Sequence, residues 1–299
     1  MTLRGYRNSI SILFGATRME ISSSNLTFHI SLVDINALKP HEEVINHIVK
    51  SLSDAVKAQG IVRDPLIVDQ DTYVILDGMH RYSSLKLLEC RFAPCCLVDY
   101  SNPMIKVGSW FRLFTVNEAE ELARKVMPDS EPSYAKLERD IEQLDPDYHT
   151  IILTKNGSRY SLKQTRNPTE FTKTAITLEQ AIVALGYHVD YQTEEVALQS
   201  LRSGIVDLVI RVPIFTKQQI TDFGVHGSLL PHKVTRHIMP SRPLRVDIPL
   251  DMLTKQGKTK QEANRELHEL LSARRVQEKP PGSVVDGRRY EEETLIFTA

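Results

Sequence analysis

The sequence lacks the features of a disulfide-stabilised or membrane-spanning protein. Its three cysteines, Cys90, Cys95 and Cys96, cannot all pair, and they lack the second Cys or His pair of a structural zinc site. No segment approaches the ~20 consecutive apolar residues of a membrane helix, and the polar N-terminus lacks the apolar core of a secretory signal. We therefore expect a cytoplasmic protein with reduced cysteines and no membrane partner.

The sequence also lacks an excess of charge of one sign. Its 37 basic and 38 acidic residues nearly cancel, whereas binding to a phosphate backbone favours a basic face. Nucleic acid is therefore not an expected partner. The usual nucleotide motifs are missing as well: there is no Gly-x-Gly-x-x-Gly, and Gly257-Lys258-Thr259 matches only the end of a P-loop, within a charged segment.

The pattern of apolar residues predicts an α/β (α+β) protein. With 299 residues, of which 41% are hydrophobic, the chain can form one large domain or two of ordinary size. Residues 26–105 are predicted as the first domain, in which short β-rich runs alternate with two helices and Gly60 follows the first helix as a cap. The expected strands are 27–32, 65–68, 73–76 and 93–98, and the expected helices are 44–56 and 80–88.

Residues 106–253 are predicted as a second α/β domain. Asn156-Gly157 is typical of a hairpin turn, and Thr177 with Gln180 has the spacing of a capping box at the start of a helix. The remaining segments are residues 1–25, an N-terminal extension, and residues 254–299, a charged tail. We expect one amphipathic helix in that tail, at residues 258–275, and a peripheral position for the tail as a whole.

The strongest candidate site is the segment Asp77-Gly78-Met79-His80-Arg81, which follows an apolar strand and opens a helix. A helix N-terminus offers backbone N–H groups and positive potential, and an arginine can grip a phosphate through two N–H bonds. The segment therefore predicts an anion-binding site suited to phosphates. The alternative is that Asp77 only caps the helix while His80 and Arg81 face solvent.

This segment resembles the Asp-Gly-His-His-Arg motif of archaeal free L-serine kinases, which belong to the ParB/sulfiredoxin-like superfamily. Three further segments resemble that family in the same order along the chain: Lys39-Pro40-His41-Glu42, Trp110 after Lys106-Val107, and Lys233-Val234-Thr235-Arg236-His237 before Pro240. The resemblance extends over residues 26–253. It implies a ParB/sulfiredoxin-like N-terminal domain that binds nucleotide and carries the catalytic groups.

The resemblance implies a kinase that transfers a phosphoryl group from ATP or ADP, with Mg²⁺, to the hydroxyl of L-serine. The product would be O-phospho-L-serine, for serine and cysteine biosynthesis. By analogy, Glu42 would accept or orient the hydroxyl proton, and Asp77 would orient the hydroxyl or hold Mg²⁺. The nucleotide phosphates would contact Gly78, Met79, His80 and Arg81, and serine would contact Trp110, Lys233, Thr235, Arg236 and His237.

The resemblance also has consequences for the arrangement of the site. Because the motifs fall in both predicted domains, we expect the site between them. Met79 replaces the first histidine of the kinase motif, which leaves the role of that histidine without a counterpart here. Sulfiredoxin chemistry is excluded at the same position, because a methionine has no ionisable thiol.

Several of these residues also have a structural interpretation. Glu42 can be an ordinary carboxylate near a helix start, Trp110 a core residue, and Lys233 to His237 a solvated basic loop. A metal pair of His41 and His47 is disfavoured because no third ligand is evident. The alternative function is a nucleotide-binding ParB-like DNA-binding or regulatory protein, but the sequence has no recognisable helix-turn-helix and almost no net charge.

Overall fold

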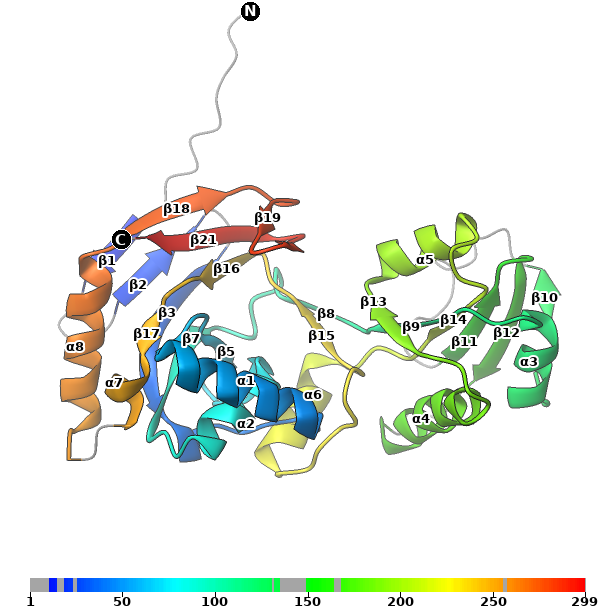
Figure 1. Cartoon of the computed structure of the whole chain (residues 1–299), viewed down its shortest axis with the longest axis horizontal. Coiled ribbons are helices and arrows are strands. Elements are labelled where there is room, and N and C mark those ends of the chain that lie inside the picture. The colour runs from blue at the N-terminus through cyan, green and yellow to red at the C-terminus, as the bar shows by residue number, and fades with distance from the viewer. Residues whose placement is uncertain are drawn as a thin grey trace, which may run out of the picture. The chain divides into compact units, whose positions relative to one another are not determined.

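The chain folds into two compact units in the computed structural model (Figure 1). The structure describes residues 11–14, 19–23, 26–130, 132–134, 149–163, 168–254 and 257–298. Unit 1 consists of Met1–Lys106, Thr221–Leu229 and His237–Ala299, and unit 2 consists of Val107–Ile220 and Leu230–Arg236. Within the described residues, no helix combines the length and apolar character needed to cross a membrane.

Unit 1 is built on a mixed sheet with the strand order β1-β2-β3-β7-β5-β6. The central strands β5 and β7 are parallel and almost entirely buried, which explains their continuous apolar sequences. The strands predicted at 65–68 and 73–76 are confirmed as β5 and β6, which pair antiparallel. The strands are β1 (Ser11–Phe14), β2 (Met19–Ser22), β3 (Thr27–Asp34), β5 (Leu66–Asp69), β6 (Ile75–Asp77) and β7 (Phe92–Val98).

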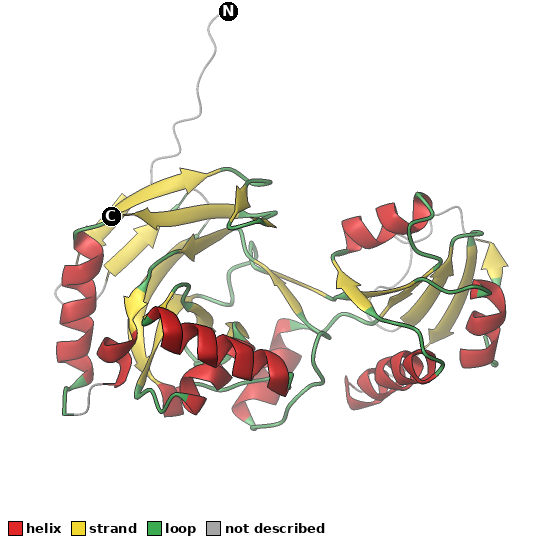
Figure 2. Cartoon of the chain, in the orientation of Figure 1, coloured by secondary structure: helices red, strands yellow, loops and turns green. Residues whose placement is uncertain are grey.

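Two predicted helices of unit 1 are confirmed. Helix α1 (Asn46–Gln59) ends at Gly60, which has the left-handed φ of 69° expected of a glycine cap. Helix α2 (Met79–Leu87) begins directly after the Asp77-Gly78 turn and packs beside α1 (Figure 2). The short elements η1 (Ile35–Ala37) and β4 (Ile61–Val62) precede and follow α1.

The charged tail differs from its expected peripheral position, because residues 257–298 build part of unit 1. Strand β21 pairs parallel with β16 and antiparallel with β18, and the apolar face of α8 packs on β3. The tail helix was expected at 258–275 and spans Lys260–Ser272, where Thr259 and Glu262 form a capping box. The C-terminal elements are β15 (Arg236–Ile238), β16 (Ser241–Leu244), β17 (Ile248–Pro249), α7 (Leu250–Thr254), α8 (Lys260–Ser272), β18 (Arg275–Lys279), β19 (Val284–Val285), β20 (Arg288–Arg289) and β21 (Glu293–Thr298).

Unit 2 contains an antiparallel sheet with the order β10-β12-β11-β14-β9-β13. Helices α3 and α4 contribute to the apolar cluster on one face, and α5 contributes to the cluster on the other. The Asn156-Gly157 hairpin is confirmed as the turn between β11 and β12. The elements are β8 (Lys106–Gly108), β9 (Phe111–Phe114), α3 (Ala119–Val126), β10 (Ser133–Tyr134), β11 (His149–Thr154), β12 (Ser158–Lys163), α4 (Pro168–Ala184), β13 (Asp190–Gln192), α5 (Glu194–Arg202), β14 (Leu208–Arg211) and α6 (Lys217–Val225), the last of which continues into unit 1.

The capping box predicted at Thr177 and Gln180 is wrong. Helix α4 begins at Pro168, so Thr177 lies in its middle, where its hydroxyl donates to the carbonyl of Lys173 at 2.8 Å. This is the back-bonding that threonine makes inside a helix, and its sequence spacing to Gln180 matches a capping box by coincidence.

The packing of α8 on β3 generates a stability prediction at Asn264. Its buried side chain accepts from Leu32 N–H at 2.8 Å and donates to Leu32 C=O at 3.0 Å. Asn264→Ala leaves both backbone groups without these partners, at about 1–3 kcal/mol for each buried group. We expect a clear loss of stability in urea denaturation, whereas Gln261→Ala on the exposed face of α8 should have little effect. Equal stability of the two variants would show that the tail does not support the sheet.

Candidate functional site

The turn between β6 and α2 has a backbone that only glycine fits. Gly78 is the N-cap of α2 with φ 102°, and a Cβ at this position would lie 2.7 Å from Leu66 Cδ2. No side chain caps α2, so Asp77 does not act as the helix cap. The first N–H groups of α2 therefore keep the anion-binding potential of a helix N-terminus. Met79, which opens the helix, is buried.

The Asp77 carboxylate instead forms ion pairs with two arginines of unit 1. Its Oδ2 accepts from Arg81 Nη2 at 3.3 Å and from Arg242 Nη1. Burial raises the pKa of Asp77, but the charges of Arg242 and Arg81 outweigh this and hold the pKa well below its usual range. Asp77 is therefore ionised at neutral pH. Its side chain is 38% exposed, which leaves it open to a ligand.

Arg81 has a second contact that fixes its orientation. Its Nη1 donates to the carbonyl of Pro65 at 2.6 Å while Nη2 reaches Asp77. The guanidinium thus connects the residue before β5 to the end of β6 and helps to hold the turn. The sequence had suggested a phosphate contact or exposure to solvent for Arg81.

The Lys-Pro-His-Glu segment runs parallel to β6. Lys39 forms a parallel bridge with Val74, and Lys39 C=O accepts from Ile75 N–H at 3.0 Å. The bridge is isolated at Lys39, so it ties the start of the segment that carries Glu42 to the strand that ends at Asp77. Glu42 is half-buried, whereas its neighbour Glu43 is exposed.

Two histidines hold this edge of unit 1 together. His41 Nδ1 bonds the carbonyl of Ile75 at 2.7 Å, which fixes the residue before Glu42 against β6. His80 Nε2 accepts from Ile45 N–H at 3.1 Å and thereby connects the first turn of α2 to the start of α1. This contact uses Nε2 of the His80 ring as a hydrogen-bond acceptor.

His237 is buried in unit 1. It does not carry the positive charge that a basic loop at residues 233–237 would suggest. Its Nε2 lies 2.8 Å from the Tyr100 hydroxyl, and its ring meets that of His41 edge-on at 5.7 Å between centroids. Burial lowers the pKa of His237 to about 3 and the pKa of His41 to about 4. Both imidazoles are therefore neutral at physiological pH.

The other predicted substrate residues gather around Trp110 in unit 2. Lys233 Nζ lies 4.3 Å and Arg236 Cζ 5.7 Å from the centroid of the half-buried indole ring, within the range of cation–π contacts. Lys233 has a positive φ of 62°, which is unusual for a lysine, and Thr235 is buried beside these cations in sequence. Trp110 is therefore not a plain core residue.

The position of Trp110 is fixed by a buried ion pair. Arg112 is fully buried, and it donates to Trp110 C=O at 3.1 Å and to Glu179 Oε2 at 2.7 Å. Tyr191 donates to the other oxygen of the same carboxylate at 2.7 Å. These contacts satisfy the buried charge and hold the start of β9 in place.

The predicted residues thus form one group in each unit. Unit 1 holds Glu42, Asp77, Gly78, Met79, His80, Arg81 and His237, and unit 2 holds Trp110, Lys233, Thr235 and Arg236. Arg242 was not among the predicted site residues. The sequence offers one weak signal, because an arginine close to Ile238, Met239, Leu244 and Val246 requires a carboxylate partner if that stretch is buried.

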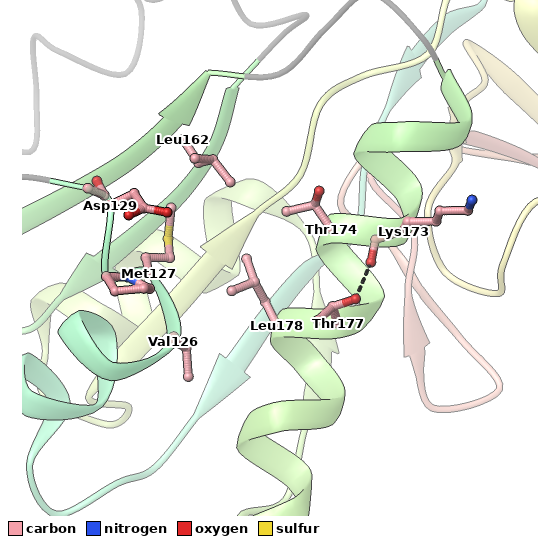
Figure 3. Close-up of a pocket in the computed structure, with 10 residues that line it drawn as sticks. Val126, Met127, Asp129, Leu162, Lys173, Thr174, Thr177 and Leu178 are labelled. Atoms are coloured by element: carbon pink, nitrogen blue, oxygen red, sulfur yellow. Dashed lines mark hydrogen bonds between the residues drawn. The ribbon is translucent and has the colours of Figure 1, made fainter.

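A separate cavity of about 280 Å³ in unit 2 contains none of these residues (Figure 3). It is lined by Val126, Met127, Pro128, Asp129, Ser130, Leu162, Lys173, Thr174, Thr177 and Leu178. The hydroxyl of Thr177 is turned to its own helix backbone, and the remaining lining is largely apolar. We therefore do not assign the predicted chemistry to this cavity.

The Asp77–Arg242 pair predicts a pH-dependent contribution to stability. The pKa of Asp77 in the folded state lies below its value in the unfolded chain, so the ion pairs stabilise the fold above the ordinary aspartate pKa of about 4. This contribution is lost as the pH falls through the folded-state pKa. In Arg242→Met, the Asp77 carboxylate loses the charge that contributes most to lowering its pKa. The pKa of Asp77 should therefore rise.

The stability difference between wild type and Arg242→Met should therefore be largest at neutral pH and shrink below about pH 4. Urea denaturation across this range measures it. Arg245→Met is the matched control, because Arg245 pairs with Asp286 at an exposed position where ion pairs contribute little. If the difference in the free energy of unfolding does not vary with pH, Asp77 is not held in the ionised form by Arg242.

The chain is similar in sequence to proteins of known function. No family model matches it. It is 27% identical over 232 residues to an ATP-dependent L-serine kinase from Staphylothermus marinus, covering 74% of this chain and 90% of the kinase. It is 26% identical over 232 residues to an ADP-dependent L-serine kinase from Thermococcus kodakarensis, covering 74% of this chain and 91% of that enzyme.

The fold is also that of a solved kinase structure. A mutant free serine kinase in complex with AMP superimposes with a TM-score of 0.61 at 21% identity, covering 75% of this chain and 93% of the other. The predicted fold class is confirmed by this match. In sequence and in fold, the chain is therefore similar over most of its length to free L-serine kinases, as its motifs predicted.

Proposed function

We propose that the chain is a free L-serine kinase that transfers a phosphoryl group from ATP or ADP to the hydroxyl of L-serine, giving O-phospho-L-serine. The main support is the arrangement in unit 1, where β6 ends at the ionised Asp77 beside the uncapped N-terminus of α2 and the segment that carries Glu42 is bridged to β6. Phosphoryl transfer needs this combination of a proton acceptor, a charged orienting group and a phosphate site.

The nucleotide phosphates bind at the first turn of α2. The backbone N–H groups of Gly78, Met79 and His80 and the positive potential of the helix start hold the phosphate oxygens. Arg81 and Arg242 pair with Asp77 at the same turn and so offset the negative charge that would otherwise repel the phosphates. The relatives are named for both ATP and ADP, so both remain candidate donors.

Glu42 accepts the proton of the serine hydroxyl as the hydroxyl oxygen attacks the phosphorus, and Asp77 orients that hydroxyl. Asp77 also fits the way Mg²⁺ is held in kinases, by one or two carboxylates together with substrate phosphates. The described residues contain no cluster of three or more His, Cys, Asp or Glu side chains suited to a metal. When bound, Mg²⁺ neutralises charge on the phosphates.

The group around Trp110 binds serine. Lys233 and Arg236 provide positive charge for the serine carboxylate and the incoming phosphoryl group, and the Trp110 ring holds both cations in place. Thr235 supplies a hydroxyl. His237 is neutral and buried, so it offers hydrogen bonds and no positive charge. We place the reaction in the cytoplasm, in serine and cysteine biosynthesis, which agrees with three free cysteines.

The test is formation of O-phosphoserine when the protein is incubated with serine, Mg²⁺ and either ATP or ADP, followed by mass spectrometry. We expect product with at least one donor. Glu42→Gln keeps the size of the side chain but removes its basicity, so turnover should fall about a hundredfold or more while nucleotide affinity changes little. Glu43→Gln, at the exposed neighbouring position, is the matched control and should retain wild-type turnover.

Two outcomes would contradict the proposal in different ways. Absence of product with either nucleotide would refute the kinase assignment, and nucleotide binding without product would favour a nucleotide-responsive regulatory protein. Product formation with near-normal turnover of Glu42→Gln would retain the kinase but assign the proton acceptor to another group, with Asp77 the first candidate.

A further inference from the structure

Arg242 connects the candidate site to the C-terminal strand of the chain. Its guanidinium is buried, with a side chain only 9% exposed, and it lies between two carboxylates. Nη1 donates to Asp77 Oδ2, and Nε donates to Glu292 Oε1 at 2.6 Å. Glu292 is also mostly buried, at 12% exposure. The result is a continuous charged network of Glu292, Arg242, Asp77 and Arg81.

The position of Glu292 is determined by the sheet. The next residue, Glu293, opens β21 and pairs with Ser241 of β16, and the following pair is Thr294 with Arg242. Glu292 therefore lies directly before β21, two residues before Thr294, the strand partner of Arg242, and the Arg242 side chain reaches back to it. This contact depends on residues 284–298, a part of the chain beyond the segments that resemble the kinases.

The geometry of a guanidinium makes this contact directional. Its donors lie in one rigid plane, so fixing Nε on Glu292 also fixes the direction in which Nη1 points. Arg81 is anchored in the same manner, because Pro65 C=O holds its Nη1 while Nη2 reaches Asp77. Both arginines contact the same oxygen of Asp77, Oδ2, so the orientation of Oδ1 follows from the two anchors.

We propose that Glu292 is a positioning residue for the reaction, which holds the Arg242 guanidinium and through it the orientation of the Asp77 carboxylate. This inference rests on the proposed kinase function. Glu292 does not contact the substrate, and its effect is carried through Arg242 alone. The C-terminal strand thereby contributes to turnover although it lies outside the catalytic segments in the sequence.

The test compares Glu292→Ala, Glu292→Gln and the control Asp286→Asn in full-length protein. Asp286 is a carboxylate of the same C-terminal segment and also pairs with an arginine, Arg245, but at an exposed position away from Asp77. The kcat, the KM for serine and the Kd for ADP are measured. Turnover is expressed per ADP-binding site counted by calorimetry, so that a partly unfolded sample cannot imitate a lower kcat.

We expect Glu292→Ala to lower kcat at least about tenfold, with KM for serine and Kd for ADP within about threefold of wild type. Glu292→Gln keeps an oxygen acceptor at the same reach and should recover at least about a third of the wild-type kcat. Asp286→Asn should remain within about twofold, since exposed ion pairs contribute little.

The inference is overturned if Glu292→Ala turns over serine at the wild-type rate. It is also overturned if Glu292→Ala weakens ADP and serine binding as much as it lowers kcat and Glu292→Gln does no better, because that pattern indicates a general structural role. A wild-type protein that makes no O-phosphoserine refutes the proposed function itself, whereas an active wild type with an unaffected Glu292→Ala refutes only this inference.

Discussion

The ion pairing of the Asp77 carboxylate with two anchored arginines is the interaction on which the candidate site depends. Asp77 ends β6 directly before a glycine turn, so its side chain cannot cap the helix that follows and needs another partner. Arg81 and Arg242 provide that partner, and their charges outweigh the cost of burial for the carboxylate. An ionised carboxylate thus stands beside the uncapped start of α2, and the two arginines offset its charge where the helix N-terminus favours phosphate binding.

The surroundings of Asp77 keep the charge at this edge concentrated in a few groups. His41 and His237 are buried and neutral, so they provide hydrogen bonds without adding cations. His80 accepts a backbone hydrogen bond from Ile45. Beside Asp77 the positive charge comes from Arg81 and Arg242, and arginines do not lose their protons near neutral pH. In unit 2, Lys233 and Arg236 face Trp110. Each unit thus offers a distinct kind of anion recognition.

Local signals in the sequence were sufficient to predict much of the first unit. The glycine after α1, the Asp-Gly turn before α2 and the paired strands β5 and β6 were all confirmed, because each depends on short-range chemistry. The segments carrying Glu42 and Trp110 were identified only through their resemblance to a family. Their assigned roles stay predictions.

What could not be predicted depends on contacts between distant residues. The Arg242–Glu292 and Asn264–Leu32 contacts span 50 and 232 residues, and no local pattern identifies the partner in either case. The tail looked peripheral because it is rich in charge, yet its charges lie on the outer face of α8 while its apolar residues cover β3. The capping box at Thr177 shows the reverse error, in which a local pattern was present but the helix began earlier.

The central claim is that the turn after β6 binds the phosphates of an adenine nucleotide. Amide hydrogen exchange with and without ADP tests it most directly, because the bound phosphates would occupy the N–H groups at the start of α2. We predict slower exchange at residues 78–81 when ADP is bound. Protection confined to residues 126–130 and 173–178, which line the cavity of unit 2, would contradict the claim and place the nucleotide elsewhere.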